Sequence, residues 1–307
     1  MNFRIILPTL LSIALFCQCS KQHSPHPAPV YAADVANAWM QLHIMLTKTT
    51  TGYNSIVSDR SFGYAGITLY ESVAPSVTGV GSLLPRIGGS AIEANKRVDQ
   101  YYWPASLNAA MADLTRDFFP TTADANKFSI DSLEKAWNDK FKKDAADQLI
   151  QNAISYGHTV AANIFEWSKT DGGHEAYAHL NDPNYTVPSE PGHWIPTPPA
   201  KAPPLLPHWG DNRSFIANIV SVTQPGAPIS FSDQPKTPFY EMVHELYTIT
   251  LSLSHEDSII VKFWGDQPGN LNVPAHATSI LIQLVQAKKM SLQEADLRLC
   301  IARHRHE

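Results

Sequence analysis

The sequence is poor in cysteine and in charged residues. Its three cysteines are Cys17, Cys19 and Cys300. Two lie in the first twenty residues and only one lies in the body of the chain, which excludes a disulfide framework and a CxxC zinc site. Charged residues are only 17% of the 307, and the net charge of −5 gives no electrostatic reason to expect binding to nucleic acid or to an anionic membrane surface. Apolar residues still reach 44%, which excludes a chain that is disordered throughout.

Several motifs of known chemistry are also missing. There is no GxSxG turn for a serine nucleophile, no GxxxxGK phosphate-binding loop and no GxGxxG after a strand. The pairs His174-Glu175, His244-Glu245 and His255-Glu256 all lack the second histidine that an HExxH zinc site requires. Scattered histidines are more often surface or capping residues than ligands, so we expect no metal site and assign no catalytic residue from these motifs.

The N-terminus has the pattern of an export signal. A basic start precedes a mostly apolar run at residues 5–16, which is shorter than the ~20 residues of a membrane-spanning helix. Residues 1–18 are therefore predicted to be a signal peptide. Cys19 and the residues after it resemble the start of a bacterial lipoprotein, in which the Cys19 thiol would carry the lipid and residues 19–33 would form a flexible tether. The alternative is an ordinary signal peptide cut around Ala32; in both cases we expect an exported protein, in the periplasm or at the outer membrane or cell surface.

Residues 34–307 are predicted to form one nearly all-α domain. Apolar residues recur at helical spacing, and no strand-like alternation is convincing. Ser254 and Ser291 each begin a capping box, and residues 121–124 have a similar pattern. The spacing predicts helices at residues 34–50, 59–74, 91–118, 131–167, 238–252 and 274–288, and a last one from residue 292.

A Pro-rich excursion interrupts this helical pattern. Thirteen of the 23 prolines lie between Asp182 and Pro238, where no helical or strand periodicity is visible. Four aromatic anchors argue against disorder and predict a segment that is laid across the helical body. These anchors are Trp194, Trp209, Phe215 and Phe231. Gly63 and Gly66 predict that a neighbouring element comes close to the helix at 59–74.

Short motifs in and around the excursion carry a family resemblance. The excursion contains GHWIPTPP at 192–199, LPHWG at 206–210 and RSF at 213–215. Further landmarks occur in the expected order, at Trp39, Arg60, 70–72 (YES), Tyr240, Val243, Glu245 and 262–269 (KFWGDQPG). Over residues 30–295 the chain therefore resembles the vanadium-dependent haloperoxidases of the PAP2 phosphatase superfamily.

The resemblance implies a chloroperoxidase/PAP2-like helical bundle and, in a complete member, a bound oxyanion. Vanadate or phosphate is held there by a Lys, an Arg-Pro pair, a Pro-Ser-Gly-His motif and a later Arg and His. The implied activity is halide oxidation with hydrogen peroxide, or hydrolysis of phosphate monoesters. Residues 297–307 do not resemble the family's continuation, so we expect the C-terminal part, and the vanadate site with it, to be missing. The chain should then be inactive, and Leu292 and Leu299 should be partly exposed.

Two stretches imitate the missing motifs, and one rival hypothesis stays open. Residues 188–193 (PSEPGH) are Pro-Ser-Gly-His with two residues inserted, which would move the histidine away from an oxyanion. Residues 303–306 (RHRH) form a basic tail, for which a solvated helix end is the ordinary interpretation. The rival is a helical, non-catalytic lipoprotein of the cell envelope that binds a glycan or a partner protein, with Trp194 and Trp209 stacking on sugar rings. The sequence does not define an oligomeric state.

Overall fold

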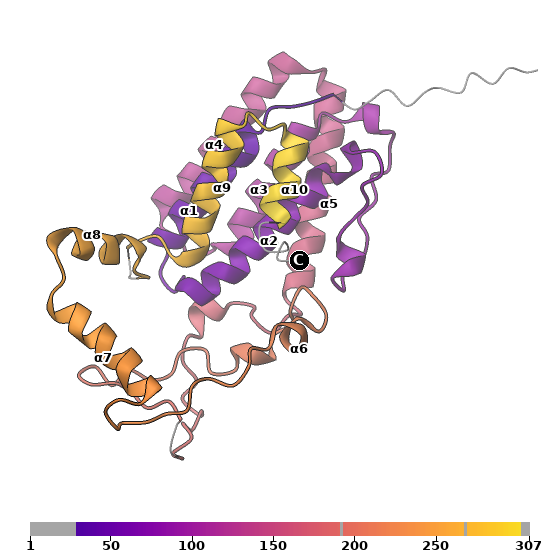
Figure 1. The fold of residues 1–307 in the computed structure, drawn as a ribbon. Coiled ribbons are helices and arrows are strands. Elements are labelled where there is room, and N and C mark those ends of the chain that lie inside the picture. Colours follow the sequence, from indigo (N-terminus) through magenta and orange to yellow (C-terminus); the bar gives the residue numbers. More distant parts are fainter. Residues whose placement is uncertain (1–28, 191–192, 267–268, 302–307) are drawn as a thin grey trace, which may run out of the picture.

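The computed structural model describes residues 29–190, 193–266 and 269–301, and the structural statements below refer to them. A helical bundle forms the body of the molecule (Figure 1). Its helices are α1 (Asp34–Thr49), α2 (Ser55–Val73), α3 (Trp103–Phe118), α4 (Asp124–Asp144), α5 (Asp147–Ser168), α9 (Val273–Ala287) and α10 (Leu292–Ile301). Within the described ranges there is no strand, and the β contacts consist of one isolated bridge between Ala32 and Ser291. The all-α prediction is confirmed.

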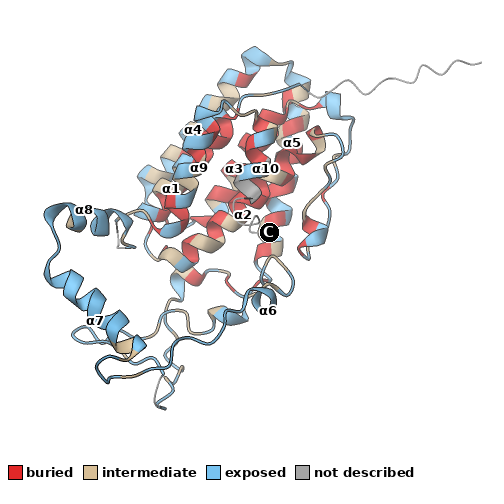
Figure 2. Cartoon of the chain, viewed as in Figure 1, coloured by how far each residue is buried: buried red, intermediate tan, exposed pale blue. Residues whose placement is uncertain are grey.

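Helix α3 lies at the centre of the bundle. It packs against α1, α2, α4 and α5, and nearly all of its side chains are buried (Figure 2). A helix that is buried on almost every side is expected only inside a core. Gly157 lets α5 approach α3 closely, because a Cβ at this position would lie 2.3 Å from the carbonyl oxygen of Ser106.

Two of the predicted helices have other boundaries in the structure. The helix predicted at 91–118 begins only at Trp103, after a short 3-10 helix, η3 (Val98–Gln100). Pro104 explains the late start, because proline fits the first turn of a helix and disrupts an interior. The single helix predicted at 131–167 is instead α4 and α5, since the backbone is extended at Ala145 and Ala146.

The capping predictions are confirmed at two of three positions. Ser254 forms a reciprocal capping box with Asp257 at the start of α8 (His255–Trp264), and Ser291 does so with Glu294. The pattern at residues 121–124 gives no side-chain cap. The hydroxyl of Thr122 lies 2.8 Å from that of Thr50 instead, so it joins α4 to the end of α1.

Leu292 is fully buried, so the prediction that it is partly exposed is wrong. Helix α10 packs along α2, and Leu292 and Ala295 are each 0% exposed. The Leu292 N–H donates to the carbonyl oxygen of Tyr31 at 2.7 Å, which ties α10 to the segment before α1. Helix α2 is thus the packing partner of α10 that we expected to be missing from this chain. The side chains of Leu299 and Cys300 lie outside the described part.

The Pro-rich excursion contains only short helices in its described part, η5 (Trp209–Asp211) and α6 (Ile219–Thr223). Trp209 and Phe215 pack against the core, as predicted. The predictions for Trp194 and Phe231 are wrong, because these side chains are 51% and 79% exposed. Phe215 lies over Gly63 of α2, where a Cβ would be 2.6 Å from the ring, so the close approach predicted at Gly63 is confirmed.

Two further helices extend away from the bundle as an arm, residues 238–264 (Figure 1). The arm consists of α7 (Pro238–Leu251) and α8. Neither helix contains a buried residue (Figure 2). A search of the described helices finds none with the length and apolar character needed to cross a membrane.

Candidate functional site

A buried ion pair joins α2 to the turn after α5. The Oδ2 atom of Asp171 accepts hydrogen bonds from Arg60 Nε at 2.7 Å and from the Tyr64 hydroxyl at 2.8 Å, and Oδ1 accepts from the Gly173 N–H at 2.7 Å. The side chains of Arg60 and Asp171 are 11% and 6% exposed, so the pair is largely shielded from water. Burial, followed by the nearby Asp171 carboxylate, raises the pKa of Tyr64, which therefore remains a protonated donor.

Arg213 attaches the Pro-rich excursion to this ion pair. Its Nη2 atom donates to the Tyr64 hydroxyl at 3.2 Å and to the Trp167 carbonyl at 3.1 Å, and its backbone N–H donates to the Asp171 carbonyl at 2.8 Å. The guanidinium carbon lies 4.3 Å from the centroid of the Trp167 ring, a cation–π contact. The clamp, as we name this group, consists of Arg60, Tyr64, Trp167, Asp171 and Arg213.

The clamp brings Arg60 and Arg213 together, and both were named as family landmarks in the sequence. Their common neighbour Asp171 was not identified from the sequence. A local signal was present, because Asp171 is followed by Gly172 and Gly173 just after a long helix. Gly172 has a φ of +94°, and a Cβ on Gly173 would lie 2.8 Å from Arg60 Cδ, so this turn depends on both glycines.

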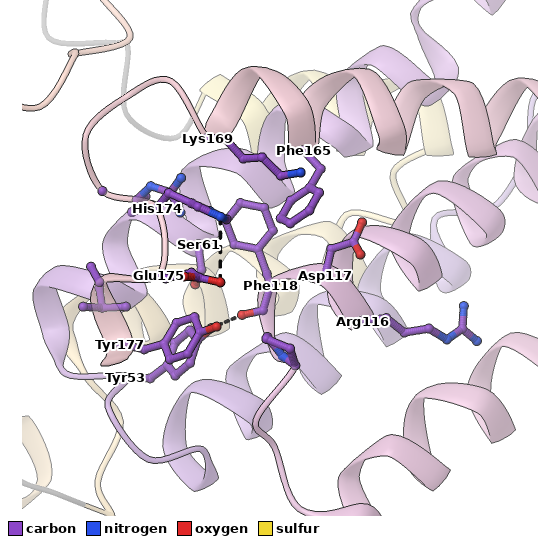
Figure 3. Close-up of a pocket in the computed structure, with 15 residues that line it drawn as sticks. Tyr53, Ser61, Arg116, Asp117, Phe118, Phe165, Lys169, His174, Glu175 and Tyr177 are labelled. Atoms are coloured by element: carbon purple, nitrogen blue, oxygen red, sulfur yellow. Dashed lines mark hydrogen bonds and ion pairs between the residues drawn. The ribbon is translucent and has the colours of Figure 1, made fainter. Parts of the chain in front are cut away.

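A cleft of about 300 Å³ lies beside the clamp (Figure 3). Tyr53 and Tyr177 stack at one end of it, with ring centroids 5.6 Å apart and an interplanar angle of 10°. The Tyr53 hydroxyl donates to the Phe118 carbonyl, which ties this end to α3. Figure 3 shows His174 and Glu175 on one side of the cleft and Asp117 on the other. The cleft was not predicted, because its residues come from α2, α3, α5 and the loop at 173–177.

The cations that line the cleft have carboxylate partners. Lys169 Nζ lies 2.5 Å from Glu166 Oε1, and Arg116 contacts Asp131 at 2.8 Å. Partial burial, followed by the charge of Asp113, raises the pKa of Asp117. The cleft therefore presents mixed charge and two tyrosine rings, which suits a small polar molecule better than a multivalent anion.

Glu175 has an unusual backbone conformation for a residue in this cleft. Its φ is +55°, in the left-handed region that favours glycine. His174 Nε2 lies 3.9 Å from Glu175 Oε1. Backbone strain of this kind is found where surrounding structure enforces it, often at functional sites.

Ser61 lines the cleft and contacts a buried histidine. His43 Nε2 lies 3.0 Å from Ser61 Oγ, and Ser61 Oγ donates to the Ser58 carbonyl at 2.8 Å. Burial lowers the pKa of His43 to about 3, so the imidazole is neutral. In the described part its Nδ1 has no partner that could orient the ring. With its proton already donated, Ser61 is not arranged as an activated nucleophile.

The two stretches that resemble the missing catalytic motifs, residues 188–193 and 303–306, form no site in the described part. His193 Nε2 lies 3.9 Å from Glu190 Oε2, and both side chains are more than half exposed. The remaining residues of that stretch at 191–192, the basic tail at 303–306 and Cys19 lie outside the described residues. Among the residues that are described, no group of three or more His, Cys, Asp or Glu side chains could hold a metal ion.

Comparison with known proteins identifies the fold. No protein-family model and no curated protein matches the sequence. Among solved structures, the chain is similar to the first bacterial vanadium-dependent iodoperoxidase, with a TM-score of 0.71 and 24% sequence identity. The match covers 88% of this chain and 65% of that one, so the chain spans less than two thirds of the iodoperoxidase chain. The chain therefore has the vanadium haloperoxidase/PAP2-like fold that its sequence motifs implied.

Proposed function

We propose that the chain is an exported protein of the vanadium haloperoxidase/PAP2 type which, as given, neither oxidises halides nor hydrolyses phosphate esters. The fold and the family landmarks at Arg60 and 213–215, which meet in the clamp, support the family assignment. The observation that carries the proposed inactivity is that the two arginines converging in the described part already have partners. Arg60 pairs with the Asp171 carboxylate. Arg213 donates to the Tyr64 hydroxyl and to the Trp167 carbonyl.

The described residues do not fit vanadate or phosphate. A buried multivalent anion requires several converging cations and N–H donors, because unpaired buried charge is very costly. Arg60 instead donates to Asp171, whose two carboxylate oxygens accept three hydrogen bonds. The Arg213 guanidinium lies next to this pair and donates to the Tyr64 hydroxyl and the Trp167 carbonyl. An oxyanion placed there would meet this carboxylate at close range.

The inactivity is tested by assaying the purified chain with orthovanadate. Iodide and bromide oxidation by hydrogen peroxide and hydrolysis of p-nitrophenyl phosphate should not exceed a vanadate-only blank. Turnover that is lost when Arg303, His304, Arg305 and His306 are replaced by alanine would contradict the proposal and locate a site in the basic tail. Alanine at four lysines of α4 controls for the loss of positive charge; these are Lys135, Lys140, Lys142 and Lys143.

Export and lipid attachment are part of the same proposal. They are supported by the short apolar run at 5–16 and by the Cys-Ser-Lys sequence that begins at Cys19. The parent protein should be extracted with membranes, whereas Cys19→Ser should be soluble or unprocessed. Cys17→Ser is the matched control and should behave like the parent. Unchanged membrane association of Cys19→Ser would exclude the lipid anchor.

A binding role without chemistry is the second candidate, and the exposure of Trp194 favours it. The Trp194 side chain is 51% exposed, so its ring is free to stack on a sugar. Titration with oligosaccharides, followed by intrinsic fluorescence, should then give a signal that Trp194→Ala abolishes. Trp264→Ala is the control, because Trp264 is similarly exposed at 54%. Equal responses in the parent and in Trp194→Ala would remove this candidate.

A further inference from the structure

The cleft beside the clamp has the size and the walls of a site for a small organic molecule. Its volume of about 300 Å³ lies at the lower end of the range for small-molecule sites. Val57 and Pro120 add apolar wall to it. At one end, Phe119 and Tyr177 stack on Tyr53, with ring centroids 4.5 Å and 5.6 Å from the Tyr53 centroid. Tyr177 ends this stack at the cleft, so a flat ring can pack beside it.

The cations at the cleft are engaged elsewhere. Arg60 is paired within the clamp and is only 11% exposed, and Arg213 lines a different cavity, of about 380 Å³. Lys169 pairs with Glu166, and its ammonium group also lies 4.6 Å from the centroid of the Phe165 ring. The guanidinium of Arg116 has three carboxylate partners and extends away from the cleft (Figure 3). None of these groups is available to a ligand without first breaking an ion pair.

Two carboxylates at the cleft are not compensated in this way. Asp117 makes no hydrogen bond within the described part, and burial followed by the charge of Asp113 raises its pKa. Glu175 lies on the other side of the cleft (Figure 3), where His174 Nε2 is 3.9 Å from its carboxylate, beyond hydrogen-bond distance. Burial, followed by the charge of Glu175, also raises the pKa of Tyr177. The excess charge at the cleft is therefore negative and attracts a cation.

We propose that the cleft binds a small primary amine that carries an aromatic ring. The ammonium group donates to the Asp117 carboxylate, which has no other donor, and Glu175 adds attraction from the opposite side. The ring packs against Tyr177 at the end of the aromatic stack. This binding involves no vanadate and no sugar, so it is independent of both candidate functions given above.

The proposal is tested by calorimetric titration of the full chain with three phenols. Tyramine, tyrosol and 4-hydroxyphenylacetate share one ring and end in an ammonium, a hydroxyl and a carboxylate group. Tyramine should bind with a dissociation constant of about 1 mM or lower, which weakens as salt is added. Tyrosol should bind at least about threefold more weakly, the scale of a partly exposed ion pair. The repelled carboxylate should bind at least about tenfold more weakly.

Variants of Asp117 separate recognition of the ammonium group from binding of the ring. Asp117→Asn should weaken tyramine binding by at least about threefold and leave tyrosol binding unchanged. Asp117→Glu keeps the charge and should keep the preference for tyramine. Asp124→Asn, at a fully exposed carboxylate, should bind all three phenols like the parent. Because the Asp117 carboxylate makes no hydrogen bond in the described part, Asp117→Asn should unfold at the same urea concentration as the parent.

Three results would overturn the proposal. These are equal binding of the three phenols, no binding of tyramine at about 10 mM, and tyramine binding that is unchanged in Asp117→Asn. The first would show that the ammonium group is not recognised. The second would show that the cleft does not bind such an amine at all, and the third would place the amine outside this cleft.

Discussion

The guanidinium carbon of Arg213 lies 4.3 Å from the ring centroid of Trp167 and fastens the Pro-rich excursion to the end of α5. Arg213 also donates to the Trp167 carbonyl at 3.1 Å. In the described part, Trp167 Nε1 and Arg213 Nε have no hydrogen-bond partner, so the contact depends on the ring face and on the two Nη atoms. The excursion is thus held by Arg213, Trp209 and Phe215 rather than by Trp194.

Arg213→Ala should release the excursion while the bundle stays folded. The variant loses a cation–π contact worth ~0.5–2 kcal/mol and charged hydrogen bonds worth ~1.5–3 kcal/mol each, mostly as local rather than global stability. Limited proteolysis within residues 182–238 should become faster by about tenfold, which corresponds to ~1.4 kcal/mol, with unchanged far-UV circular dichroism. Arg213→Lys should not restore protection, because an ammonium group cannot lie flat on Trp167 and reach the same acceptors. Arg97→Ala, at an exposed arginine, is the control.

Asp171→Asn should destabilise the whole protein by about 3–5 kcal/mol, the scale of breaking a buried ion pair. The amide is isosteric, but Arg60 then keeps a buried charge without a counterion. Either orientation of the amide also sets its NH₂ against a donor, which is the Gly173 N–H on one side and Arg60 with Tyr64 on the other. Urea unfolding measures the loss.

The exposed pair of Arg97 and Asp99 provides the control for this prediction. Their side chains are 70% and 53% exposed, so Asp99→Asn should cost less than about 1 kcal/mol. A similar cost for both variants would show that the Asp171 ion pair contributes no more than a surface contact.

Helices were predictable where a local signal determines them. Apolar spacing and the capping boxes at Ser254 and Ser291 located α8 and α10 because each depends on residues within one or two turns. The start of α3 was predicted too early, although Pro104 was visible as a first-turn residue. The burial of Leu292 was not predictable in this way, since its neighbours on α2 lie more than 200 residues away along the chain.

Only part of the clamp was predictable, because its residues are also far apart along the chain. The landmarks at Arg60 and Arg213 came from a family resemblance, but their common partner Asp171 is 111 residues from Arg60. The aromatic residues of the Pro-rich excursion were all predicted to pack on the helical body. The sequence alone does not show whether the body has a groove beneath a given aromatic side chain. Phe215 has one, over Gly63, and Trp194 does not.

Gly63→Ala should have opposite effects in two backgrounds. In the parent, a Cβ at this position would lie 2.6 Å from the Phe215 ring, so the ring must move and stability should fall by about 1–3 kcal/mol. With Phe215→Ala already present the space is free, and alanine should stabilise α2 by about 0.5–1 kcal/mol through its higher helix propensity. Urea unfolding of the four proteins in this cycle gives both values. The same sign in both backgrounds would show that Phe215 does not sit on Gly63 in solution.

Asp296 on α10 is a buried carboxylate whose two oxygens have no hydrogen-bond partner in the described part. The residue is 2% exposed, and this burial raises its pKa well above the ordinary value of 3.8. The unfolded chain therefore loses this proton at a lower pH than the folded chain does. Between those two pKa values the folded state binds more protons, so stability must fall as pH rises.

Asp296→Asn should remove this part of the pH dependence. Below about pH 4 the difference between the parent and the variant should be constant, because Asp296 is then neutral in both the folded and the unfolded parent. As pH rises above about 4, the unfolded parent ionises first, so the parent should lose about 1–3 kcal/mol relative to the variant, the scale of an unpaired buried polar group. Urea unfolding of both proteins from pH 3 to 8 measures the difference, in which the other titrating groups cancel. Asp124→Asn, at a fully exposed carboxylate, should keep the parental profile. A constant difference between parent and Asp296→Asn across this range would mean that Asp296 is paired or solvated in the folded protein.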